Sequence, residues 1–127
     1  MSAVDDAFYQ HDIVRAMAKV TLQLATDLGA NTQPHQDVLD ASEGALRALA
    51  ASGQKAPADL HDKTEAYLQS IRDGYEGIKT EANERLALAA SVSVPIGVNV
   101  EMESLRATKA HEWVKAIDAA HGSRGGS

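Results

Sequence analysis

The residues of this chain best suited to chemistry are its five histidines, His11, His35, His61, His111 and His121. A histidine can bind a metal ion, carry a phosphoryl group or transfer protons. His61 and Glu65 lie four residues apart, so on a helix both side chains would share one face and could ligate a metal. Two ligands do not complete a site, and the sequence has neither a Glu-x-x-His nor a His-Glu-x-x-His motif. We therefore interpret His61 as a solvated residue in a first helical turn.

Two other histidines stand beside an acid, in the pairs His11-Asp12 and His111-Glu112. A phosphotransfer helical bundle exposes one histidine followed shortly by a Lys-Gly pair, and that pair is absent after every histidine here. The sequence also lacks the glycine-rich phosphate loops and the Gly-x-Ser-x-Gly nucleophile motif. We therefore expect a protein that is not an enzyme and that uses no metal or cofactor.

The composition narrows the class of protein further. A chain of 127 residues suits one domain, and the absence of cysteine excludes disulfides and thiolate metal sites. The net charge is -6 and the basic residues are scattered, so a nucleic-acid partner is not expected. The acidic first residues contain no signal peptide, and no apolar run is long enough to span a membrane. The expected setting is therefore cytoplasmic or otherwise soluble.

Hydrophobic periodicity predicts four helices, over residues 4–28, 36–52, 57–90 and 104–120. Ser2 can cap the first helix at its start, and Gly29 can end it. The third helix is long and contains Gly74 on its apolar face, where we expect another helix to approach closely. A kink in the helix is the alternative. These features predict a mainly α fold, a three- to four-helix bundle with a single domain at 1–121 and a disordered tail at 122–127.

The first predicted helix has two apolar faces. Ile13, Met17, Val20, Leu24 and Leu28 form the stronger face, and a weaker stripe on the other side includes Phe8, His11 and Leu22. Such a helix is either the centre of a bundle or a contact with another chain. We keep both interpretations and take Phe8, His11 and Leu22 as candidate contact residues.

The stretch SVSVPIGVNVEME, residues 91–103, has the rhythm of a β-strand rather than a helix. Apolar side chains occupy every second position, and Pro95 and Gly97 suit a turn. The alternatives are a small β-hairpin, one extended segment on the bundle surface, or an uncharged membrane-active tongue at 86–100. An unpaired strand edge is a template for pairing with another chain. The candidate contact residues here are Val92, Val94, Ile96, Val98 and Val100.

These observations favour a non-enzymatic structural or adaptor protein that acts through oligomerisation or contacts with another protein. Such a protein could be an assembly component, a virion-type structural protein or a secretion chaperone. The expected partner is a second copy of the chain or a different protein, and a membrane is not favoured. The alternative functions are a membrane-active helical protein and a small metal-binding or phosphotransfer-like bundle.

Overall fold

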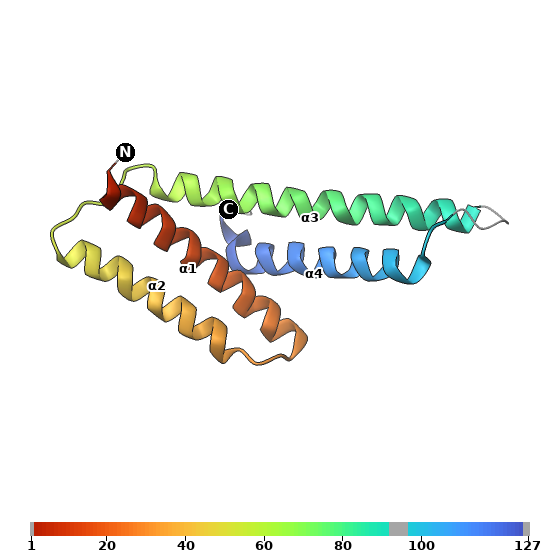
Figure 1. Ribbon diagram of the computed structural model, residues 1–127, viewed down its shortest axis with the longest axis horizontal. Helices are drawn as coiled ribbons and strands as arrows, with labels where there is room; N and C mark the ends of the chain where they lie inside the picture. The colour runs from red at the N-terminus through yellow and green to blue at the C-terminus, as the bar shows by residue number, and fades with distance from the viewer. Residues whose placement is uncertain (1, 92–96, 126–127) are drawn as a thin grey trace.

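The structure, a computed structural model, describes residues 2–91 and 97–125, and this part of the chain forms four helices. They are α1 (Ala3–Leu28), α2 (Gln33–Ala51), α3 (Leu60–Ser91) and α4 (Val100–Gly125). The predicted helical bundle is confirmed. Among the described residues α1 packs against all three other helices, whereas α2 packs against α1 alone (Figure 1). The two apolar faces of α1 thus have partners within the chain.

Local capping explains where α1 begins and ends. The Ser2 side chain accepts a hydrogen bond from the Asp5 backbone N–H at 3.1 Å. Asp5 and Asp6 place negative charge in the first turn, which the helix dipole favours. Gly29 ends the helix in the left-handed conformation, with φ of 67°. Both predicted caps of this helix are confirmed.

The predicted β-element at 91–103 is wrong over the described part of that range. α4 begins at Val100, four residues before the predicted start, and no described residue forms a strand. The Asn99 side chain caps the helix by accepting the Met102 backbone N–H at 3.0 Å. Acidic Glu101 and Glu103 then occupy the first turn. The first predicted strand arm, with Val92, Val94 and Ile96, lies outside the described residues.

We call the part of the molecule that includes α1 and α2 the inner half, and residues 78–91 and 97–112 of the chain the outer half. The inner half contains the main core. Small and branched side chains from three helices meet there, and both large aromatic rings beside the core stack with centroids 5.2 Å apart. The core residues are Ala16, Val20, Leu68, Ala116 and Ile117, and the stacked rings are Tyr75 and Trp113. Alanines at such positions let helix axes approach closely. In the outer half, α3 and α4 continue side by side beyond α1 and α2 (Figure 1).

The expected close approach at Gly74 is wrong. A Cβ added to Gly74 or to Gly77 would meet no atom within 4 Å, and both glycines are exposed. α3 nonetheless runs without interruption through both positions. At its far end, α4 extends to Gly125 rather than ending near Ala120, and residues 126 and 127 lie outside the described residues.

Candidate protein-contact surface

One face of α4 is buried in the inner half of the molecule and exposed in the outer half. Residues eleven positions apart return to nearly the same side of a helix, because eleven residues complete about three turns. Leu105 therefore shares a face with Ala116, and Met102 shares one with Trp113. Ala116 is fully buried against α1, but Leu105 and Met102 remain 50% and 57% exposed. The apolar face thus continues outward past the helix that covers it.

The outer part of α3 contributes a second stripe to the same side. Ile78 and Leu88 are exposed, and with Glu81 and Arg85 they follow a 3-4-3 spacing along one side of the helix. Ala82 and Ala110 are buried on α3 and α4, respectively. Viewed along each helix from its N-terminus, the α3 stripe is rotated away from Ala82 in the same direction as the α4 stripe is rotated away from Ala110. Because the two helices run antiparallel, rotations in the same direction put both stripes on the same side of the pair.

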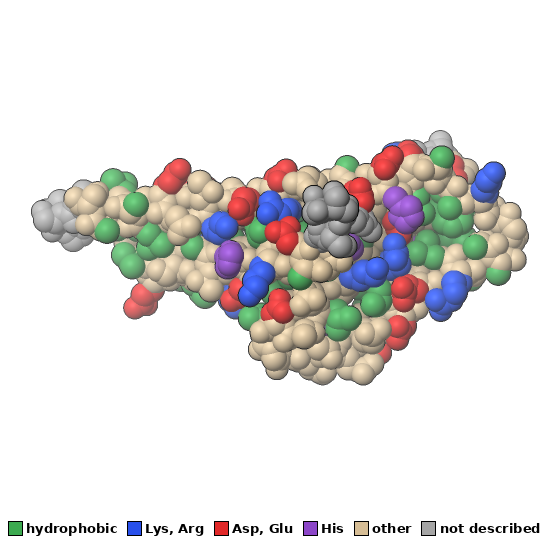
Figure 2. Space-filling view, turned by 180° about the vertical axis from the view of Figure 1, so that it is seen from behind, with side chains coloured by type: hydrophobic (Ala, Val, Ile, Leu, Met, Phe, Trp, Pro, Cys, Tyr) green, Lys and Arg blue, Asp and Glu red, His purple; other side chains and the backbone are tan. Residues whose placement is uncertain are grey.

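We call the exposed apolar residues Ile78, Leu88, Met102 and Leu105 the outer surface. Hydrophobic side chains are visible on the projecting end of the molecule in Figure 2, where α3 and α4 have no third helix beside them. A single exposed leucine is ordinary, but several apolar residues gathered on one side of a two-helix projection are typical of a contact site.

An ion pair beside this surface holds the two outer helices together. The Arg85 guanidinium donates to Glu103 on α4 at 3.2 Å and also binds Glu81 one turn earlier on α3. Glu103 is only 8% exposed. The sequence does contain the relevant signal, because Glu103 belongs to a 4-3-4-3 pattern that continues through Ala107, Ala110, Val114 and Ile117.

Two further polar contacts tie α3 to its neighbours. The Tyr9 hydroxyl donates to Asp59 just before α3, which raises the pKa of Tyr9 to about 12 and lowers the pKa of Asp59. Arg72 on α3 donates to Asp118 on α4 at 2.7 Å, and this pairing lowers the pKa of the Asp118 carboxyl. These contacts join the start of α3 to α1 and the middle of α3 to α4.

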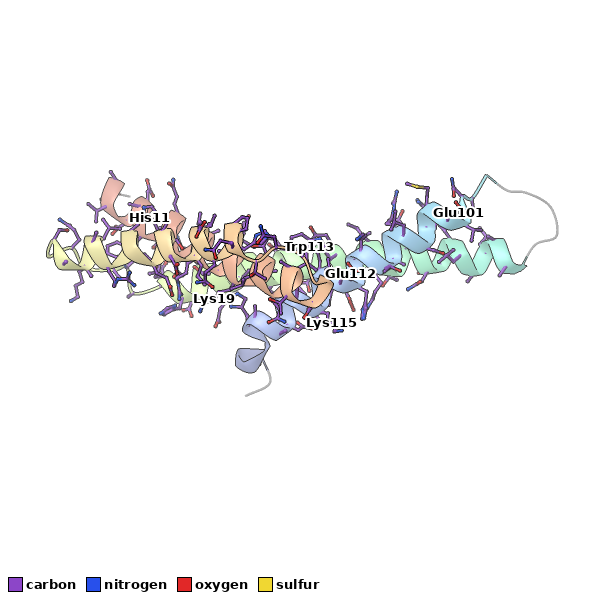
Figure 3. All side chains as sticks on the ribbon, turned by 90° about the horizontal axis from the view of Figure 1, so that it is seen from below. His11, Lys19, Glu101, Glu112, Trp113 and Lys115 are labelled. Atoms are coloured by element: carbon purple, nitrogen blue, oxygen red, sulfur yellow. The ribbon has the colours of Figure 1, made fainter. Side chains whose placement is uncertain are left out.

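The contact residues predicted on α1 lie away from the outer surface. Phe8 is only 3% exposed, and His11 and Leu22 are partly buried. Figure 3 shows His11 and Glu101 toward opposite ends of the molecule. The contact residues predicted on α1 therefore lie far from the start of α4, where Val100 is described, and Phe8 serves the packing of its own chain. Of the later valines, Val98 is partly buried and Val100 is exposed in the first turn of α4.

An open groove of about 380 Å³ lies between α1, α2 and the start of α3. Its lining residues are Phe8, Asp12, Arg15, Glu43, Leu46, Arg47, Ala56, Leu60 and His61. Asp12, which is 2% exposed, accepts hydrogen bonds from Arg15 at 2.9 Å and from the Thr64 hydroxyl at 2.5 Å. Its carboxylate is thus fully engaged in joining α1 to α3, and we assign it a structural role.

The histidines do not assemble into a metal site within the described residues, where no group of three potential ligands occurs. His61 is exposed on the groove wall, and His111 is exposed on α4. The helices described at residues 2–91 and 97–125 include none with the length and apolar character needed to cross a membrane.

No protein-family model, curated protein or solved structure matches this chain. Its function is therefore inferred from the geometry of the outer surface.

Proposed function

We propose that this protein is a structural or adaptor protein without enzymatic activity, and that it works by binding another helical surface through the outer surface of α3 and α4. One observation carries the proposal: the α4 face that α1 buries at Ala116 stays exposed at Met102 and Leu105. The exposed apolar side chains of this face gain free energy when they too are removed from water. The partner is a second copy of the chain or a different protein.

Polar groups in the outer half support a protein partner over a lipid one. Glu81, Arg85, Arg106 and Lys109 stand among the apolar residues of this half. Charges of both signs suit a protein surface with matching charges, and they oppose insertion into hydrocarbon. The uncharged end of the projection, at 86–91 and 97–100, is the feature that favours the membrane-active alternative.

The test is the molar mass of the wild type and of a Leu105→Glu variant, measured by light scattering. Val38→Glu is the matched control, because Val38 on α2 is 47% exposed and Leu105 is 50% exposed. We expect a mass above the 13.5 kDa of one chain for the wild type and for Val38→Glu, and the mass of one chain for Leu105→Glu. Circular dichroism checks that both variants keep their helices.

A wild type that stays monomeric requires a second measurement, flotation with liposomes of neutral and of anionic lipid. If the wild type binds either liposome and the Leu105→Glu substitution abolishes this binding, the partner of the outer surface is a membrane and not a protein. An assembly that survives the Leu105→Glu substitution would contradict the proposal directly, because its contact would lie elsewhere.

A further inference from the structure

We infer that the partner of the outer surface is a second copy of the chain, and that the two copies pair antiparallel about a two-fold axis into a four-helix bundle. This inference rests on the proposed function and specifies the partner and its orientation. Each copy contributes the outer halves of α3 and α4.

Two outer halves placed face to face supply the four helices of a bundle. Each is an antiparallel helix pair that exposes the four apolar side chains of the outer surface on one side, and Figure 1 shows no third helix beside it among the described residues. Four-helix bundles enclose apolar side chains among four helices, and two such pairs placed face to face have that architecture. In a two-fold contact the same patch meets itself, so one exposed surface is sufficient for both copies.

The charge of the outer half is compatible with pairing to itself. Residues 78–91 and 97–112 contain four basic and five acidic side chains, whereas the whole chain has a net charge of -6. The acidic excess is therefore mostly outside the outer half, and two outer halves meet without strong repulsion. Because the outer half carries charges of both signs, it also has the means to form ion pairs with its own copy.

The chain exposes more surface than a compact monomer of the same mass. The chain has 7714 Å² of accessible surface, and a compact monomer of 13.5 kDa would have about 6,500 Å². A standard protein interface buries about 800 Å² on each partner. The excess over a compact monomer, about 1,200 Å², is larger than one partner's share of such an interface.

The position of α1 selects the antiparallel arrangement. α1 packs on the inner part of the same α4 face that carries Met102 and Leu105 farther out. In a parallel pair the two α1 helices would stand opposite each other and would hold the outer surfaces apart by the thickness of two helices, about 20 Å. In an antiparallel pair each α1 lies beyond the end of the partner's projection, and the outer surfaces can meet.

The chain has no cysteine, so one introduced cysteine gives one spin label per copy. We choose Asp62→Cys at the inner end of α3 and Ala90→Cys at its outer end, both at exposed positions. Pulsed electron paramagnetic resonance then measures the distance between the two spin labels of a dimer. Light scattering on each labelled variant confirms that it still has the mass of the wild type.

An antiparallel pair centred on the uncovered part of α3 puts the Asp62→Cys labels about 65 Å apart along the helix axes, and the Ala90→Cys labels much closer together. The expected result is a mass of twice one chain and this large difference between the two separations. Equal separations would overturn the antiparallel arrangement, and a trimer or larger assembly would overturn the two-fold pairing. In both cases a loss of assembly on Leu105→Glu would leave the proposed function standing. A monomeric wild type would overturn the pairing of two copies and leave a different protein as the partner. Liposome binding that Leu105→Glu abolishes would overturn the proposed function as well.

Discussion

At the scale of single residues, Tyr9 and Asp59 form a contact whose contribution to stability depends on pH. The hydrogen bond from Tyr9 raises the pKa of its hydroxyl from 10.0 to about 12 and lowers the pKa of the Asp59 carboxyl. Because the pKa of Tyr9 is higher in the folded than in the unfolded chain, its hydrogen bond stabilises the fold fully at pH values below 10.0, the unfolded pKa. This contribution is lost as the pH rises through about 12. The lowered Asp59 pKa acts at the other end, because its contribution is lost as the pH falls below the unfolded value.

The measurement is an ultraviolet titration of tyrosinate, with Tyr9→Phe subtracted to isolate Tyr9 from the other tyrosines. We expect Tyr9 to ionise near pH 12 in the wild type and closer to its ordinary value of 10.0 in Asp59→Asn. Ionisation of Tyr9 at its ordinary value in the wild type would show that the bond to Asp59 does not form in solution.

We predict that Gly74 and Gly77 destabilise α3 and that no packing contact compensates for this. Each lies in the interior of α3, and a Cβ at either position would meet no atom within 4 Å. Gly74→Ala and Gly77→Ala should therefore each raise the free energy of unfolding by about 1 kcal/mol, measured by urea denaturation. Gly53→Ala is the contrasting variant and should destabilise, because Gly53 has φ of +87°. A loss of stability on Gly74→Ala would mean that the glycine has a packing role in solution.

At the scale of elements, Asn99 decides that the Val-rich stretch ends in a helix rather than a strand. Its side chain accepts the Met102 N–H and its carbonyl accepts the Glu103 N–H, so the first turn of α4 starts from one residue. Asn99→Ala should lower the free energy of unfolding by about 1 kcal/mol, and Asn99→Asp should retain most of it. Urea denaturation of both variants tests this. Equal stability of Asn99→Ala and the wild type would show that the Asn99 cap does not stabilise α4.

The strand prediction failed because two patterns coincide between Val98 and Glu103. Alternating apolar and polar residues indicate a strand, but an asparagine followed by two acids also indicates a helix start. The helical pattern gains its support from farther along the chain, where Ala110, Val114 and Ile117 are buried. Glu103 joins that buried row because Arg85 on α3 neutralises it.

At the scale of the whole molecule, α3 and α4 extend past α1 and leave the projecting half without cover (Figure 1). If two copies pair through this half, the folded state gains stability with protein concentration by mass action. Raising the concentration a hundredfold should increase the Tm of the wild type by on the order of 5 °C. Differential scanning calorimetry measures the shift, and Leu105→Glu, whose Tm should not depend on concentration, is the control. A constant Tm in the wild type would argue against any self-association.

The sequence by itself determined the four helices, the caps of α1 and the two apolar faces of that helix, because these features depend on local spacing and on one or two capping residues. It did not determine what covers each face. The sequence predicted Phe8 as a contact residue, but the chain's own helices bury it. Leu105 was not predicted as a contact residue and is half exposed. The tertiary structure decided both, since burial depends on where helices from distant parts of the chain cross and on how far one extends past another.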